Sequence, residues 1–151
     1  MNTAKRTLDH ISYGGEVFEI SNFNNLCNTW GQNIINASKD KCWISCCGRV
    51  FKFLREHFSP CISTTVKTGD EGIYALLTSD INGKKRIFLV NMHSASVEVS
   101  LSGLGMNKAY LLFSDKRMNY EKESESYLFE NACDLDGNSF WLNGLSVCCL
   151  E

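Results

Sequence analysis

The chain contains a single proline, Pro60, and the pattern of its apolar residues changes there. The segment before it carries one apolar stripe at helical spacing: Val50, Phe51, Leu54 and Phe58. Proline lacks a backbone N–H and restricts the residue before it, so this helix is expected to end just ahead of Pro60. The segment after it consists of short β-type runs separated by turn residues. The pattern therefore predicts a helical segment over residues 1–60 and an all-β domain over residues 66–151.

The downstream runs predict an antiparallel sheet. The expected strands cover residues 73–78, 86–92, 97–101, 109–113, 127–129, 140–142 and 145–150. Asn82-Gly83 separates the first two, and because both residues tolerate positive φ they favour a tight hairpin. The run Val97–Leu101 alternates apolar and polar residues, as a strand with one buried face does. With no intervening helical pattern, the fold class is mostly β, an antiparallel β-sandwich preceded by helices.

An earlier helix is expected over Ile20–Ile35. Its apolar residues recur at helical spacing: Phe23, Leu26, Cys27, Trp30 and Ile34. Five asparagines in the same segment lower its intrinsic helix propensity. The asparagines are therefore expected to serve contacts made by their side chains rather than to favour the helix.

Charge and hydropathy exclude two classes of partner. The net charge is -2, and the only basic run, Lys84–Arg86, lies beside the predicted hairpin turn, so it indicates a solvated turn rather than a phosphate-binding patch. No stretch approaches the length of a membrane span, and Met1 is followed by polar residues rather than an apolar signal region. Neither nucleic acid nor a membrane is expected as a partner.

The eight cysteines include two adjacent pairs, Cys46-Cys47 and Cys148-Cys149. Adjacent cysteines cannot easily bridge one another, so reduced thiols are favoured over a disulfide framework. A zinc site would draw on Cys42, Cys46, Cys47 and Cys61, but the zinc-typical C-x-x-C spacing is missing.

The expectation is no metal and no cofactor, with cysteine serving as a small core hydrophobe. Reduced thiols and the polar N-terminus slightly favour the cytoplasm, and localisation is otherwise unknown. The single glycosylation sequon, at Asn36, is of a kind that often occurs by chance.

Three segments of the predicted β-domain resemble the C-terminal β-domain of retaining glycoside hydrolases that have a (β/α)8 catalytic barrel. They are Arg86–His93, whose strand ends in an asparagine, Val97–Leu101, and Leu142–Val147. Asn143-Gly144 stands where that family usually has a proline pair. The resemblance implies that residues 66–151 form the accessory sandwich of such an enzyme.

The upstream half is similar to α-L-arabinofuranosidases. Ser21–Trp30 resembles their "A-N-x-A-Q-x-V-N" segment late in the barrel, and Gly48–His57 matches the helix that leads from barrel to β-domain. The resemblance implies that residues 1–60 are a helical remnant of the barrel's end. It also implies a role in hydrolysing plant-type polysaccharides, with carbohydrate as the partner, bound through the missing barrel or weakly.

Retaining glycosidases use two carboxylates about 5 Å apart, and in the family resembled both precede the segment matched here. Glu16 and Glu19 are assigned instead to the first turn of a helix, where negative charge is favourable. No catalytic residue is therefore expected, and the chain alone should be inactive. Two substrate contacts are implied by the resemblance: Asn25 matches the glutamine that faces the sugar, and Asn28 matches the second asparagine. For both, a structural role is favoured over a ligand contact.

Other candidate residues have simpler interpretations. Trp30, Trp43 and Trp141 could stack on sugars, but burial at element ends is the commoner arrangement. His57 beside Glu56 fits a histidine at a helix end, and His93 is expected to be exposed after a strand.

Three hypotheses compete. The chain is the accessory region of an arabinofuranosidase-like hydrolase, or residues 66–151 form an autonomous carbohydrate-binding or structural module, or Cys42–Cys61 belongs to a small enzyme or metal protein. The apolar stripe before Pro60 adds a physical requirement, because without a barrel it must fold back on the sandwich, stay partly exposed or mediate self-association.

Overall fold

The computed structural model describes residues 1–12, 34–37, 39–40, 42–59, 61–114 and 128–151. Within them the chain forms two helices, α1 (Asn2–Ser12) and α2 (Cys46–His57). The strands are β1 (Ile35–Ala37), β2 (Cys42–Ile44), β3 (Cys61–Val66), β4 (Ile73–Asp80), β5 (Lys85–Asn91), β6 (Val97–Ser100), β7 (Lys108–Ser114), β8 (Leu128–Asp134), β9 (Ser139–Leu142) and β10 (Ser146–Leu150). The mostly β fold class is confirmed.

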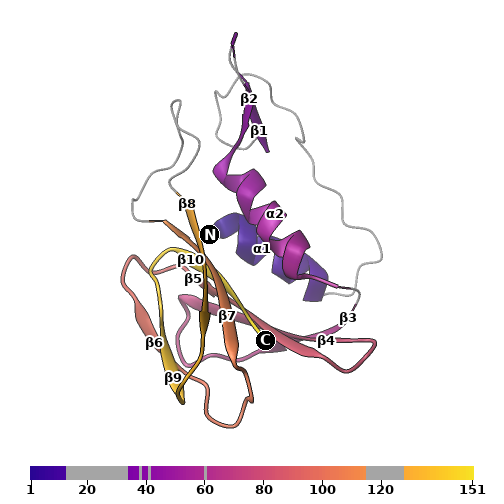
Figure 1. Cartoon of the computed structure of the whole chain (residues 1–151), viewed down its shortest axis with the longest axis vertical. Coiled ribbons are helices and arrows are strands. Elements are labelled where there is room, and N and C mark those ends of the chain that lie inside the picture. Colours follow the sequence, from indigo (N-terminus) through magenta and orange to yellow (C-terminus); the bar gives the residue numbers. More distant parts are fainter. Residues whose placement is uncertain (13–33, 38, 41, 60, 115–127) are drawn as a thin grey trace.

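A six-stranded sheet forms the centre of the molecule (Figure 1). Its order is β3-β4-β5-β10-β7-β8, and every neighbouring pair is antiparallel. The C-terminal strand β10 therefore lies between β5 and β7, and it joins the two halves of the sheet. A two-stranded sheet, β6-β9, lies beside it, and the β1-β2 hairpin projects from the opposite end (Figure 1).

The predicted hairpin between β4 and β5 is confirmed. Gly83 has a φ of +78°, in the region that favours glycine. The Asp80 carboxylate accepts hydrogen bonds from the backbone amides of Asn82 and Lys84, each at 2.9 Å. The turn is thus closed by an aspartate that precedes it as well as by the glycine within it.

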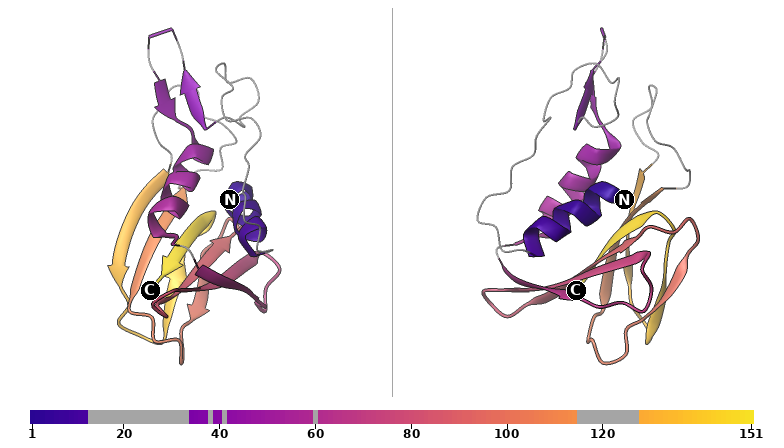
Figure 2. Two further views of the ribbon diagram at one scale, coloured as in Figure 1. Left: turned by 90° about the vertical axis from the view of Figure 1, so that its right-hand side faces the viewer. Right: turned by 180° about the vertical axis from the view of Figure 1, so that it is seen from behind.

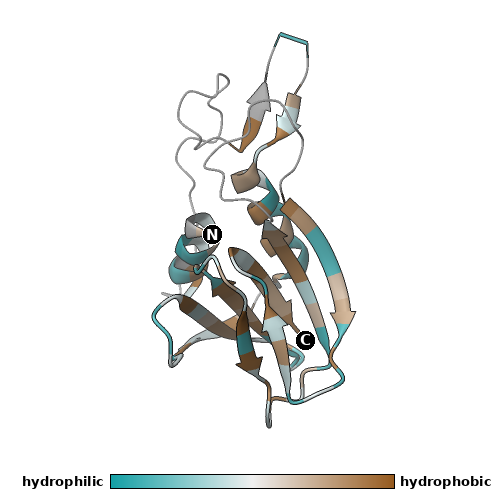
Figure 3. Cartoon of the chain, turned by 90° about the vertical axis from the view of Figure 1, so that its left-hand side faces the viewer, coloured by the Kyte–Doolittle hydropathy of each residue, from teal (hydrophilic) through white to brown (hydrophobic). Residues whose placement is uncertain are grey.

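Strand alternation gives the sheet two apolar faces. On β5, Phe88 and Val90 face the helices, whereas Ile87 and Leu89 face the β6-β9 ribbon. Both helices lie across the first face, as the rotated views in Figure 2 show. Because strands buried on both faces read as continuous apolar runs, β5 and β10 show no polar alternation (Figure 3).

The pair Cys148-Cys149 follows from the same alternation. The two side chains belong to the cores on opposite faces of the sheet, and both are fully buried and free. Burial raises the pKa of Cys149 to about 12 and the pKa of Cys148 well above its ordinary value. The prediction that these cysteines are core hydrophobes is confirmed.

Helix α2 ends just ahead of Pro60, as its sequence predicts, and it begins at Cys46, two residues before the expected Gly48. The Ser45 hydroxyl caps it by accepting from the Gly48 amide at 3.1 Å, and the last helical residue is His57. Val50 and Leu54 of the predicted stripe are buried against the sheet, and Phe58 packs against the same core. The third buried apolar residue is Phe53, whereas the predicted Phe51 is only partly buried. The apolar stripe therefore folds back on the sandwich. The expectation of self-association through this helix assumed that the stripe is exposed to solvent. Because the stripe is covered by the sheet, that reason no longer applies, and self-association stays a prediction.

Helix α1 was not predicted. Its apolar residues Ala4, Leu8 and Ile11 lie on one face, and the first two are fully buried against α2 and the sheet. Strand β3 was missed as well, and it places the start of the sheet at Cys61 rather than at residue 66. The division of the chain into two domains remains a prediction.

The helix expected over residues 20–35 lies outside the described residues, apart from its last two. Of these, Ile35 begins strand β1. No helix among the described residues is long and apolar enough to cross a membrane.

Gly144 lies in the turn before β10, and a Cβ atom built there would collide with the backbone carbonyl of Ser94. Gly144→Ala is therefore expected to lower the free energy of unfolding by about 1–3 kcal/mol, since backbone must move to admit a methyl group. Gly69→Ala is the matched control, because nothing lies within 4 Å of its Cβ position. Urea unfolding of the two variants measures the difference, and equal midpoints would contradict the packing described.

Candidate functional site

A charged cluster lies at one end of the central sheet. We call Lys84, Arg86, Tyr110 and Glu151 the Glu151 cluster. The Glu151 carboxylate accepts from Lys84 Nζ at 2.6 Å, Arg86 Nε at 3.2 Å and the Tyr110 hydroxyl at 3.1 Å. These residues come from the β4-β5 turn, β5, β7 and the chain after β10, so one carboxylate connects three adjacent strands.

Further contacts neutralise the Glu151 cluster. The Arg86 guanidinium also donates to the Ser59 hydroxyl at 2.9 Å and lies 3.9 Å from the Asp80 carboxylate. Two cations thus face two carboxylates, and the Arg86 and Glu151 side chains are only 18% and 19% exposed. The hydrogen bond from Lys84, followed by those from Tyr110 and Arg86, lowers the pKa of Glu151. An ionised, three-fold bonded carboxylate cannot serve as a proton donor near neutral pH.

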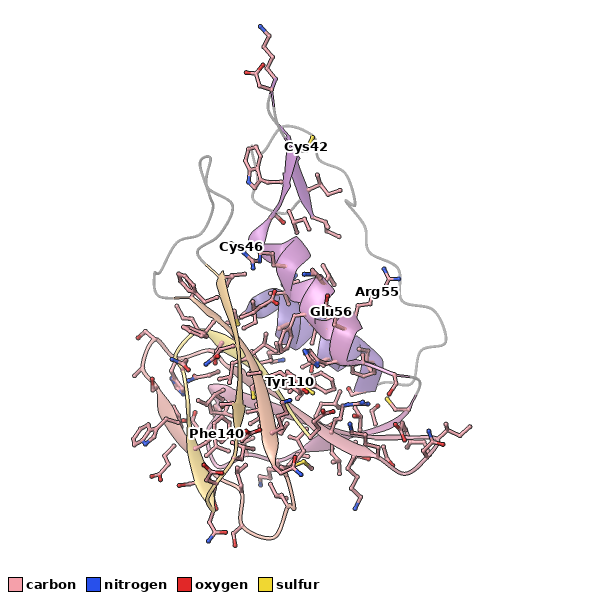
Figure 4. The ribbon with its side chains drawn as sticks, viewed as in Figure 1. Cys42, Cys46, Arg55, Glu56, Tyr110 and Phe140 are labelled. Atoms are coloured by element: carbon pink, nitrogen blue, oxygen red, sulfur yellow. The ribbon has the colours of Figure 1, made fainter. Side chains whose placement is uncertain are left out.

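A pocket of about 230 Å³ lies beside this cluster, between α2 and strands β7 and β8. It is lined by Phe53, His57, Tyr110, Leu111, Glu130, Asn131 and Ala132. Tyr110 points from the sheet toward α2 in Figure 4. The volume is below the roughly 300–1,000 Å³ of sites for drug-sized ligands, so only a small molecule would fit.

His57 lies in this pocket wall between two aromatic rings. Its ring centroid is 4.7 Å from that of Phe53 and 4.4 Å from that of Tyr110. Burial lowers the pKa of His57, which keeps the imidazole neutral at pH 7. The neighbouring Glu56 pairs with Lys52 at 3.6 Å. These contacts favour the interpretation of His57 as a histidine packed at a helix end.

The Glu151 cluster predicts an acid-sensitive stability. Because its folded pKa lies below the ordinary value of 4.5, the ionised carboxylate stabilises the fold above about pH 4.5, and this stabilisation is lost as pH falls through the folded pKa. Glu151→Gln should reduce the free energy of unfolding at pH 7 by about 1 kcal/mol and flatten its decline in acid. Glu56→Gln, on an exposed helix pair, should change neither. Urea titrations from pH 7 to 3 compare the variants; parallel curves would refute the role of Glu151.

The opposite end of β5 carries a buried amide. Asn91 is fully buried, and its Nδ2 lies within hydrogen-bond distance of three backbone carbonyls, those of Ala95 (3.0 Å), Leu142 (3.3 Å) and Asn143 (3.0 Å). Its Oδ1 accepts from the His93 amide at 2.9 Å. The asparagine that ends this strand therefore fixes two loops to the sheet.

His93 is exposed, as predicted, and it has a partner. Its Nε2 lies 2.8 Å from Asp70 Oδ1, which also accepts from the Gly72 amide at 2.7 Å. The hydrogen bond with His93, then that from Gly72, lowers the pKa of Asp70. A Cβ on Gly72 would collide with the His93 ring, so a larger residue there would force the ring to move from this position. The arrangement joins the β3-β4 turn to the loop after β5.

Several residues predicted from sequence lie outside the described residues: Glu16, Glu19, Asn25, Asn28 and Trp30. The assignment of Asn25 and Asn28 as substrate contacts stays a prediction. Trp43 on β2 is partly buried, but the indole of Trp141 on β9 is 65% exposed, so the expectation of burial is wrong for Trp141. It points outward because its neighbours Phe140 and Leu142 supply the packing of that strand.

The zinc interpretation gains no support from the described part of the chain. There, no group of three or more His, Cys, Asp or Glu side chains could hold a metal ion. Cys42 is exposed on β2 and Cys46 begins α2 (Figure 4). Cys61 begins β3.

No protein-family model matches the sequence, and no curated protein is similar to it in sequence. Solved structures do share its fold. A family 51 glycoside hydrolase, the arabinofuranosidase from Xanthomonas axonopodis pv. citri, matches 79% of the chain at 17% identity with a TM-score of 0.56. A family 30 endoxylanase from Clostridium papyrosolvens matches 99% at 17% identity (TM-score 0.53), and the family 30 xylanase C from Talaromyces cellulolyticus matches 79% at 12% identity (TM-score 0.54).

The chain spans only part of these enzymes: 28%, 36% and 27% of their respective lengths. At such low identity the matches establish a shared fold. The chain has the fold of a glycoside hydrolase β-domain, with its helices included in the match to the endoxylanase.

Proposed function

We propose that this chain is the C-terminal β-domain region of a glycoside hydrolase, which supports a catalytic barrel and carries no catalytic carboxylates of its own. One observation carries the proposal. The sheet and its packed helices match glycoside hydrolases over 79–99% of this chain but only about a quarter to a third of theirs. A chain that spans so small a share of these enzymes has the size expected of an accessory unit.

The polar clusters support a structural role. The Glu151 cluster and Asn91 lie at opposite ends of β5, and each satisfies its charges or hydrogen bonds within the fold. Retaining chemistry needs one carboxyl group that is protonated near neutral pH and a second beside it. Glu151 does not meet the first requirement, because its pKa is lowered and three donors surround it.

We further propose that the enzyme is arabinofuranosidase-like and acts on plant-type polysaccharides. Two independent lines support this finer assignment: the resemblance of Ser21–Trp30 to the arabinofuranosidase barrel segment, and the match to the family 51 enzyme. Asn25 and Asn28 are the substrate contacts that this assignment implies. Family 30 enzymes with the same fold make a xylan-directed hydrolase the competing specificity.

Hydrolysis assays test the proposal. The purified chain should release no product from aryl α-L-arabinofuranoside, arabinan or xylan. Turnover that copurifies with the chain, and that persists when the protein is made in a host lacking such hydrolases, would overturn it. A barrel-containing form should cleave one of these substrates, and the preferred sugar would decide between arabinofuranosidase and xylanase.

An autonomous carbohydrate-binding module is the second candidate, and the exposed indole of Trp141 favours it. Such a module would bind a polysaccharide without any barrel. The two functions are compatible, because an accessory domain can also hold substrate.

A further inference from the structure

The β6-β9 ribbon separates its residues strictly by face. Its inward residues Val99, Phe140 and Leu142 belong to the core shared with the central sheet, and the partly buried Val97 pairs with Leu142 on the same face. Phe140 marks this ribbon in Figure 4. The outward residues are Glu98, Ser100, Ser139 and Trp141, and all four are exposed. Three hydrogen-bonding side chains therefore share one surface with a single large aromatic ring.

Packing among the described residues does not explain the size of Trp141. Its indole is 65% exposed, whereas the inward Leu142 beside it is fully buried. An exposed indole offers a flat apolar face with a negative electrostatic potential, which attracts polarised C–H groups. One face of a pyranose or furanose ring presents such C–H groups, while its edge presents hydroxyls.

Glu98 is positioned to accept those hydroxyls. It is the register partner of Trp141 across the antiparallel pair, so the two side chains are neighbours on the same face. The Ser139 hydroxyl donates to Glu98 Oε1 at 2.7 Å and orients the carboxylate. Among the described residues Glu98 forms no ion pair, and its second oxygen can still accept hydrogen bonds.

We propose that Glu98, Ser139 and Trp141 form a binding site for one sugar ring of a neutral polysaccharide, with the ring stacked on Trp141 and its hydroxyls donating to Glu98. The choice of a sugar rather than another hydroxyl-rich ligand rests on the proposed function. A basic peptide could also place a cation over the indole beside Glu98, and the experiment includes that partner as a competing outcome.

Titration of the purified chain with xylohexaose and with arabinohexaose tests the site, with the indole N–H resonances followed by NMR. We expect saturable shifts of the Trp141 indole signal with one of the two sugars. Trp141→Ala should weaken binding by about tenfold or more, Trp141→Phe by less because it retains a ring, and Glu98→Gln by several-fold. Phe129→Ala is the matched control, since Phe129 on β8 is a 45% exposed aromatic outside the ribbon and should leave binding unchanged.

Three results would overturn the site: no binding at high millimolar sugar, binding that Trp141→Ala leaves intact, or shifts produced by a lysine-rich peptide but by neither sugar. Urea midpoints verify that the variants are folded, and we expect those of the Trp141 variants to be unchanged because Trp141 points outward. Loss of this site would leave the accessory role standing, because that role is tested by hydrolysis and by the size of the native polypeptide.

Discussion

Asn91→Asp is expected to lower the free energy of unfolding by about 3–5 kcal/mol, the range for an uncompensated buried charge. The substitution preserves shape but replaces a donor with a carboxylate that faces three backbone carbonyls, of Ala95, Leu142 and Asn143. Since domains of this size are stable by only about 5–15 kcal/mol, the variant should be close to unfolding at room temperature. Urea unfolding followed by circular dichroism measures the loss.

The control for this substitution is Asn131→Asp. Asn131 lies on β8 and is exposed, so the same chemical change there should alter stability by less than about 0.5 kcal/mol. If both variants unfold at similar urea concentrations, the fully buried environment assigned to Asn91 is wrong. Lowering the pH to protonate the introduced carboxyl should narrow the difference in stability between Asn91→Asp and the unsubstituted protein at the same pH, because the buried charge is then removed.

Phe88→Ala should cost about 3–5 kcal/mol for a different reason, the loss of a large side chain from the helix-side core. Phe88 is fully buried, and its ring is stacked on that of Phe58 with centroids 4.9 Å apart. The ring therefore joins the central strand β5 to the segment just after α2. Thermal and urea unfolding should both show the loss.

Phe129→Ala provides the comparison, because the same truncation at a 45% exposed ring removes less buried surface. We expect a change of about 1 kcal/mol or less. A cost at Phe88 no larger than at Phe129 would mean that the helices do not pack on this face of the sheet.

Elements determined by local patterns were predicted well. Helix α2 follows from its apolar stripe and from the proline after it. The β4-β5 hairpin follows from Asn82-Gly83, and β6 follows from its two-residue alternation. Each signal depends on residues within about one turn or one strand of one another.

Features that depend on distant partners could not be predicted in this way. The position of β10 between β5 and β7 depends on strand pairing between residues more than 30 positions apart in the sequence. Strand β3 was missed because at the sheet edge four of its six residues are exposed, which hides the apolar signal. Helix α1 was missed because its segment is polar apart from Ala4, Leu8 and Ile11. The helical spacing of these three residues is the one signal in the sequence that indicates the helix.

The candidate site shows the same division. The asparagine ending β5 was recognised from the resemblance, but its contacts with Leu142 and Asn143 arise only when β9 is folded beside it. The Glu151 cluster has no sequence signature, since Lys84, Tyr110 and Glu151 are far apart along the chain. The exposure of Trp141 follows from the strand's orientation, and alternation with Phe140 and Leu142 could have indicated it.

The size of the native polypeptide tests the central claim most directly. An antibody raised against this chain should detect, in extracts of the source cells, a protein about three times larger than 17.0 kDa, because the matched hydrolases are about three times longer than this chain. Peptide mass mapping of that protein should place two carboxylate-bearing barrel strands ahead of these residues. A single native species of 17 kDa, with no larger form, would contradict the assignment of this chain as the β-domain region of a glycoside hydrolase.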